Sequence, residues 1–166
     1  APVPEGRTEV VSMWGWPEEW KNWTWAGHEG KPLQVSVYTR CDEVRLELNG
    51  KVVGTKQVPK QNNLPSQMEN PTRSRDIRAL AARFWVPYQP GKLVATGLKN
   101  GKEVARQILK TADQPAKIRI SAERKSVSAS PADLAYFNIE VVDEKGLLVP
   151  DAVVPVEFEI GGVGQL

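Results

Sequence analysis

The feature of this sequence that most constrains its fold is an alternation of apolar and polar residues with a period of two. In two consecutive stretches the apolar positions are Leu33, Val35, Val37, Val44, Leu46 and Leu48. This period places the apolar side chains on one face of a β-strand. Asn49-Gly50 follows the second stretch, and Asn100-Gly101 joins another pair of strand-like runs. Because both central residues of a type I′ turn need positive φ, Asn-Gly predicts a β-hairpin at each place.

Further short runs are rich in β-branched or aromatic residues and are bounded by turn-forming residues, which indicates strands. These runs are residues 9–14, 20–25, 82–86, 117–121, 135–142 and 153–160. The best helical candidate, residues 75–83, is only one or two turns long. With 13 prolines and 13 glycines as punctuation, the pattern predicts an all-β chain: an antiparallel immunoglobulin-like β-sandwich followed by a partial second β-sandwich.

A domain boundary is expected between residues 111 and 117, where Pro115 interrupts a polar stretch and the net charge changes sign. Residues 1–113 are long enough for a complete sandwich. Residues 117–166 number 50, about half of the ~100 residues in an immunoglobulin-type sandwich. Residues 114–166 are therefore interpreted as the truncated N-terminal part of a second domain. The alternative is a natural mini-domain that ends in a flexible tail.

Composition excludes several classes of function. The chain carries 22 Lys plus Arg against 20 Asp plus Glu, for a net charge of +2, whereas a nucleic-acid-binding domain needs a concentrated basic face. The arginine-rich stretch 57–83 is expected to be a mobile loop, with a partner-binding arm as the alternative. No apolar run approaches the ~20 residues that span a membrane, and the first ten residues lack the pattern of a signal peptide.

No set of residues forms a recognisable catalytic or metal site. The adjacent acidic pairs are interpreted as solvated turns: Glu18-Glu19, Asp42-Glu43 and Asp143-Glu144. Cys41 and His28 are the only cysteine and histidine, too few for a Cys/His zinc site. No phosphate-binding glycine motif is present. We therefore expect no catalytic residue, no metal and no cofactor in this chain.

Tryptophan is the most informative residue locally, because five of the six tryptophans fall within twelve positions: Trp14, Trp16, Trp20, Trp23 and Trp25. Exposed indole rings stack on the C–H faces of sugars and can form a carbohydrate-binding platform. Large aromatic residues are also common in cores and domain contacts. The pattern leaves both interpretations open, and they differ in the solvent exposure of the rings.

Three separated blocks, in order, resemble the C-terminal accessory region of glycoside hydrolase family 2 β-galactosidases. They are VVSMWGWPEEWKNWTWAGHEGKPLQVSVYTRCDEVRLELNGKVVGTK, FWVPYQPGKLVATGLKNGKEVARQILKTADQPAKIRISAERKSV and AYFNIEVVDEKGLLVPDA. The resemblance implies one β-sandwich module followed by an invasin-type immunoglobulin-like module. It places the family's catalytic glutamates in a (β/α)₈ barrel, which needs about 250 residues and cannot be contained here. No residue of this chain matches a catalytic motif.

The resemblance implies a non-catalytic part of a bacterial β-galactosidase, whose parent hydrolyses terminal β-galactosides. The expected partners are the catalytic barrel and other domains of the parent chain, and the expected role is interdomain packing. A carbohydrate-binding module that uses exposed tryptophans is the alternative, and an adhesion domain is a third hypothesis. An unpaired strand edge also predicts a homodimer of this part alone. By resemblance only, the parent is expected in the periplasm or outside the cell.

Overall fold

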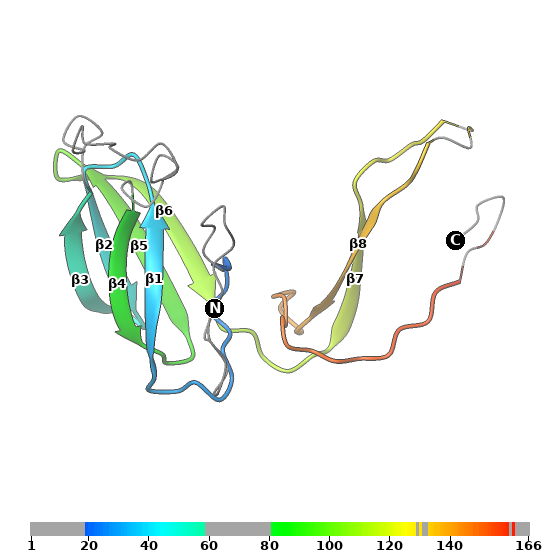
Figure 1. Ribbon diagram of the computed structural model, residues 1–166, viewed down its shortest axis with the longest axis horizontal. Coiled ribbons are helices and arrows are strands. Elements are labelled where there is room, and N and C mark those ends of the chain that lie inside the picture. The colour runs from blue at the N-terminus through cyan, green and yellow to red at the C-terminus, as the bar shows by residue number, and fades with distance from the viewer. Residues whose placement is uncertain (1–18, 59–80, 129, 131–132, 160, 162–166) are drawn as a thin grey trace, which may run out of the picture. The chain divides into compact units, whose positions relative to one another are not determined.

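The computed structural model describes residues 19–58, 81–128, 130, 133–159 and 161. The chain divides into two compact units, Ala1–Thr111 and Ala112–Leu166, and Figure 1 shows the strands of each. All the secondary-structure elements in the described ranges are β-strands, and each pair of neighbouring strands is antiparallel. The all-β antiparallel prediction is confirmed. None of the described ranges contains a helix that could cross a membrane.

Unit 1 contains two sheets that form a sandwich (Figure 1). One sheet has two strands, in the order β1-β4, and the other has four, in the order β3-β2-β5-β6. The strands are β1 (Pro32–Tyr38), β2 (Glu43–Leu48), β3 (Lys51–Gln57), β4 (Ala81–Pro87), β5 (Lys92–Lys99) and β6 (Lys102–Lys110).

Both predicted Asn-Gly hairpins are present, joining β2 to β3 and β5 to β6. Asn49 and Asn100 each have a φ of 51°, and Gly50 and Gly101 have φ values of 80° and 74°. Two consecutive positive φ angles are what a type I′ turn requires, and asparagine and glycine tolerate them best. The local sequence therefore sets the register of these two strand pairs.

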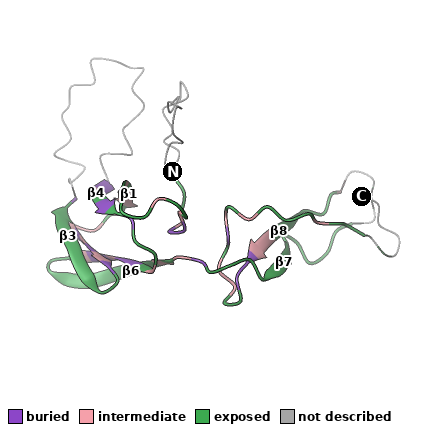
Figure 2. Cartoon of the chain, turned by 90° about the horizontal axis from the view of Figure 1, so that it is seen from below, coloured by how far each residue is buried: buried purple, intermediate pink, exposed green. Residues whose placement is uncertain are grey.

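The core of unit 1 lies between the two sheets, and Figure 2 shows how burial varies along the chain. Of the alternate residues predicted to face inward, those on β2 are buried, whereas Leu33, Val35 and Val37 on β1 are partly buried. Val44 and Leu46 on β2 are fully buried, and Phe84 and Val86 on β4 are nearly so. Trp23 joins this cluster from outside the strands.

Residues 20–25 were predicted to form a strand, and this prediction is wrong: the segment is irregular. Its described hydrogen bonds are mostly local or run to side chains rather than to a neighbouring strand. The side chain of Asn22 bonds both the N–H and the C=O of Thr24, and the Trp25 N–H donates to the hydroxyl of Tyr88. These bonds satisfy the backbone without a ladder.

The predicted helix and one predicted strand do not correspond to elements of the described structure. The predicted helix 75–83 ends inside β4, which begins at Ala81, because the alternation of AARFWVP serves a strand with one buried face; residues 75–80 lie outside the described residues. So do the expected strand 9–14 and most of the arginine-rich stretch 57–83.

Unit 2 contains the strands β7 (Lys117–Ala122) and β8 (Phe137–Val142), which pair antiparallel. Cross-strand partners share a face, so Ile120 and Ile139 lie together on one side, with Ile118–Val141 and Ala122–Phe137 beside them. The opposite face carries Arg119 and Glu140, joined by an ion pair of 2.9 Å. Residues 153–159 were predicted as part of a strand, but they form none and have no ladder partner among the described residues.

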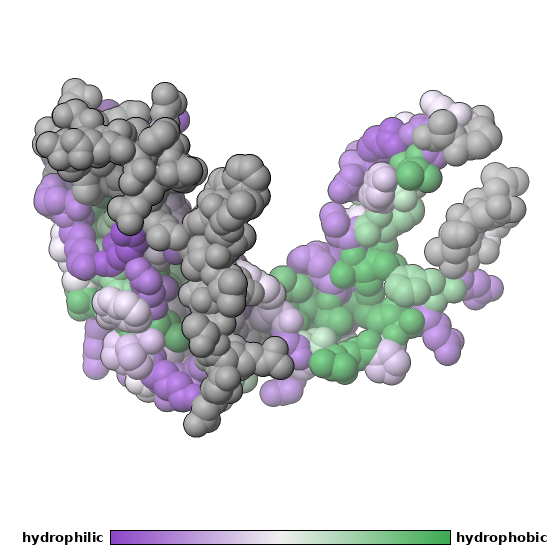
Figure 3. Space-filling view, viewed as in Figure 1, coloured by the Kyte–Doolittle hydropathy of each residue, from purple (hydrophilic) through white to green (hydrophobic). Residues whose placement is uncertain are grey.

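The apolar face of the β7–β8 sheet is open to solvent. Ile120 is 63% exposed and Phe137 is 58% exposed, and Figure 3 shows hydrophobic side chains gathered on unit 2. A two-stranded sheet is marginally stable in water without a packed face. This face therefore has the character of one half of a sandwich core.

Asp143, directly after β8, is the polar centre of unit 2 and is fully buried. Its carboxylate accepts hydrogen bonds from the backbone N–H groups of Asp113, Lys145 and Leu147, at 2.8 to 3.0 Å. It thereby ties the segment that precedes β7 to the turn that follows β8.

Candidate functional site

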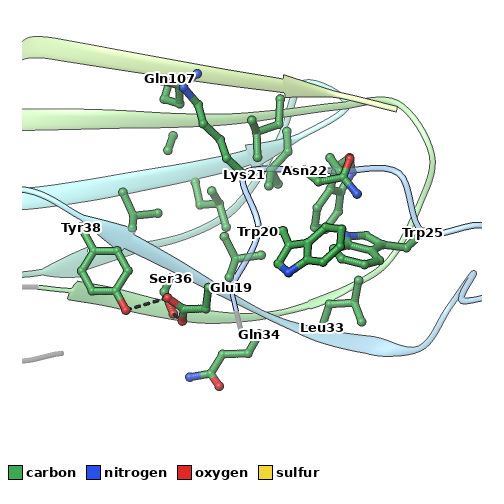
Figure 4. Close-up of a pocket in the computed structure, with 17 residues that line it drawn as sticks. Glu19, Trp20, Lys21, Asn22, Trp25, Leu33, Gln34, Ser36, Tyr38 and Gln107 are labelled. Atoms are coloured by element: carbon green, nitrogen blue, oxygen red, sulfur yellow. Dashed lines mark hydrogen bonds between the residues drawn. The ribbon is translucent and has the colours of Figure 1, made fainter. Parts of the chain in front are cut away.

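A groove of about 600 Å³ lies in unit 1 between segment 19–25, strand β1 and the inner faces of β5 and β6 (Figure 4). Apolar residues of both sheets form its floor, among them Val35, Leu93 and Leu109. Its aromatic and polar lining residues are Glu19, Trp20, Lys21, Asn22, Trp23, Trp25, Gln34, Ser36, Tyr38 and Gln107. We call it the Trp20 groove.

Trp20 and Trp25 lie at one end of the Trp20 groove, close to Leu33 in the view of Figure 4. The side chain of Trp20 is 56% exposed, and Trp25 is half-buried and packs against the core. The Asn22 turn explains the arrangement, because its bonds to Thr24 bend the chain. This bend lets neighbouring tryptophans point in different directions.

Trp23 is instead part of the core, with only 2% of its surface exposed. Its ring packs edge-on against Tyr88, with 5.2 Å between ring centroids and an interplanar angle of 69°. The indole N–H donates to the carbonyl of Gln89 at 3.1 Å, and the hydroxyl of Thr111 donates to the Trp23 carbonyl at 2.7 Å. A buried indole with a satisfied N–H is a packing residue.

At the other end of the groove, Glu19 bonds two hydroxyl groups of β1. The hydroxyls of Ser36 and Tyr38 each donate to one oxygen of its carboxylate, both at 2.6 Å. Ser36 and Tyr38 alternate with the inward-facing residues of β1, so strand period brings the two hydroxyls to the same side. Glu19 and Lys21 are the only charged residues among the described lining.

The structure separates the five predicted tryptophans. Trp20 and Trp25 line the groove together and Trp23 reaches it only from the core, while Trp14 and Trp16 lie outside the described residues. The sixth tryptophan, Trp85, lies at the surface, which was not predicted from the sequence. It is 66% exposed on β4, and its place between the inward-facing Phe84 and Val86 was the available signal.

Within the described ranges, no group of three or more His, Cys, Asp or Glu residues is arranged to hold a metal ion. Cys41 is a free, half-buried thiol whose sulfur lies against Gly97. His28 lies in an exposed turn, with Nδ1 3.2 Å from the carbonyl of Ala26.

Two family models match separate parts of the chain. Residues 30–105 match a family model described as a domain of unknown function, DUF4982. Residues 118–166 match the model of the glycoside hydrolase family 2 C-terminal domain 5.

The relatives are much longer enzymes. A β-galactosidase of Thermoanaerobacter pseudethanolicus is 34% identical over 80% of this chain and 18% of its own length. The β-galactosidase BoGH2A of Bacteroides ovatus is 32% identical over 86% of this chain and 15% of its own length. A solved glycosyl hydrolase family 2 member from Bacteroides cellulosilyticus is 32% identical, with a TM-score of 0.67, over 89% of this chain and 18% of that one. The chain thus spans less than a fifth of these relatives.

Proposed function

Since the chain corresponds to the C-terminal accessory region of family 2 glycoside hydrolases, we propose that it is a non-catalytic part of a β-galactosidase. The observation that carries this proposal is the coverage: the β-galactosidase relatives match 80% and 86% of the chain but only 18% and 15% of their own length. The parent then hydrolyses terminal β-galactosides with retention of configuration, using two carboxyl groups about 5 Å apart in its catalytic domain.

A galactoside substrate is favoured over a glucuronide by the similarity of the relatives. The two β-galactosidases are 34% and 32% identical to the chain, whereas the relatives described as a putative β-glucuronidase and a β-glucuronidase are 31% and 25% identical. An assay of the parent with both substrate classes tests this preference.

The proposed role of the chain is packing against other domains of the parent. The exposed apolar face of the β7–β8 sheet supports this role, because an uncovered face of this kind marks a contact surface. Ile118, Ile120, Phe137 and Ile139 form the surface that another part of the parent would cover.

Two measurements test the proposal. The 166-residue chain, assayed with chromogenic β-galactoside and β-glucuronide, is expected to show no turnover, and turnover would overturn the non-catalytic role. Hydrogen exchange of the parent and of the isolated chain tests the packing role. The amides of β7 and β8 are expected to be better protected in the parent. Equal protection in both would refute packing on this face.

A further inference from the structure

The Trp20 groove has the size and wall chemistry of a ligand site. Its volume of about 600 Å³ lies within the range of roughly 300–1,000 Å³ typical of small-molecule sites. Such sites combine apolar and aromatic walls with a few placed polar groups, and this groove has both. We propose that the Trp20 groove binds a neutral pyranose of a glycan chain.

The aromatic end supplies the stacking surface. A pyranose ring has apolar C–H faces and polar hydroxyl edges, so it stacks on an indole face while its edge reaches polar groups. Trp20 is the ring that is available for this contact, because it is 56% exposed, whereas Trp23 is 2% exposed and committed to the core. Trp25 and Leu33 extend the apolar wall at the same end.

The polar end supplies hydrogen bonds of a particular kind. The carboxylate of Glu19 is an acceptor. Ser36 and Tyr38 each already donate to one of its oxygens, and the remaining lone pairs of these oxygens suit the hydroxyl groups of a sugar.

Charge selects between sugar classes. The described lining has one negative and one positive group, Glu19 and Lys21, whose charges balance. The hydroxyls around Glu19 donate to its carboxylate, which leaves a negative acceptor at that end. A uronic acid would place a second carboxylate near the first, and like charges at short range repel. Neutral hexosides are therefore preferred to uronates.

The test is binding by the 166-residue chain, followed by tryptophan fluorescence and calorimetry. The probes are galactose, lactose, β-1,4-galactan oligosaccharides and, as the anionic counterpart, galacturonate oligosaccharides. Saturable binding is expected for neutral probes, and tighter binding of oligosaccharides than of galactose would identify a polymer rather than a free sugar as the source. Trp20→Ala is expected to weaken binding by about tenfold or more.

Trp85→Ala is the matched control, because Trp85 is also more than half exposed on the same unit but does not line the groove. Both variants are expected to keep the thermal stability of the unsubstituted 166-residue chain. Trp85→Ala is also expected to keep the affinity of that chain for neutral probes. Glu19→Gln removes the negative charge of this side chain. This variant is expected to lower the ratio of the affinity for neutral probes to the affinity for anionic probes.

Four outcomes would overturn the proposal: no saturable binding of any neutral probe up to its solubility limit, unchanged binding by Trp20→Ala, an equal loss in Trp85→Ala, or equal affinity for galacturonate oligosaccharides. These outcomes are separate from the proposed packing role, which concerns the β7–β8 face. Sugar binding with unchanged exchange of β7 and β8 in the parent would refute packing alone.

Discussion

Trp23 is a large aromatic residue in the core of unit 1. It is almost fully buried, contacts Tyr88 edge-on, and donates to the Gln89 carbonyl. Trp23→Ala is expected to lower the free energy of unfolding by about 3–5 kcal/mol, because it leaves a cavity and an unpaired carbonyl. Urea denaturation followed by circular dichroism measures the change. Trp85→Ala, at an exposed site, is expected to change it by less than about 0.5 kcal/mol, and equal losses would contradict this account.

The ionisation of Asp143 makes the folding stability of unit 2 depend on pH. The backbone N–H of Asp113 is the main cause that holds the pKa of Asp143 below its usual value; the N–H groups of Leu147 and Lys145 and the charge of Lys145 add to it, against the effect of burial. A lowered folded-state pKa means that the stabilisation is present above the unfolded value of about 3.9. It is lost as the pH falls through the folded-state pKa.

The variant Asp143→Asn tests this dependence, because an amide keeps one acceptor oxygen but cannot accept on its nitrogen. At neutral pH the variant is expected to unfold at a lower temperature than the unsubstituted 166-residue chain. This difference is expected to shrink as the pH falls from about 4, the unfolded-state value, and to be lost once the pH passes through the lowered folded-state pKa of Asp143. Thermal unfolding across pH measures it, and a constant difference at all pH values would exclude the role assigned to the charge.

At the scale of elements, the two Asn-Gly turns look equivalent in sequence but differ in what their asparagines bind. The side chain of Asn49 donates to the Pro90 carbonyl at 3.0 Å and accepts from the Lys92 N–H at 2.8 Å. It therefore ties the β2–β3 turn to the loop before β5. The side chain of Asn100 makes no such bond in the described part of the chain.

Asn49→Gly and Asn100→Gly form a matched pair, because glycine keeps the positive φ of both turns. Asn49→Gly is expected to lower the free energy of unfolding by about 1–2 kcal/mol through two lost hydrogen bonds. Asn100→Gly is expected to change it by a few tenths of a kcal/mol, about the size of a surface effect. Chemical denaturation of both variants compares them, and equal effects would show that the loop contact adds nothing.

The elements show what the sequence could and could not predict. Alternation predicted strands where a ladder partner exists, as in β1 and β2. It failed at residues 20–25, because their polar groups bond side chains far along the chain, such as Thr111 and Tyr88. A local pattern carries no information on such partners.

The same limit applies to the candidate site. The tryptophan cluster was visible in the sequence, but which rings are exposed depends on the bend at Asn22. The hydrogen bond between the side chains of Glu19 and Ser36 joins residues 17 positions apart, so no local sequence motif could predict it. Glu19 was interpreted as a solvated turn residue, whereas the fold places it at one end of the groove.

At the scale of the whole molecule, the open apolar face of β7 and β8 has a consequence for the chain in isolation. Exposed hydrophobic patches and free strand edges favour association with a second copy. Both edges of this two-stranded sheet lack a neighbouring strand within the described ranges, and Ile118, Ile120 and Phe137 are about half exposed or more. We therefore expect concentration-dependent dimerisation through unit 2.

Two lysine substitutions on opposite faces of β7 separate this cause from a general effect of charge. Ile120 lies on the apolar face and its neighbour Ser121 on the polar face. Ile120→Lys is expected to weaken dimerisation by about tenfold or more, since it places a charge in the apolar contact. Ser121→Lys adds the same charge on the other face and is expected to leave association nearly unchanged. Sedimentation equilibrium over a range of concentrations measures both. A monomer at every concentration, or an equal effect of the two lysines, would refute dimerisation through this face.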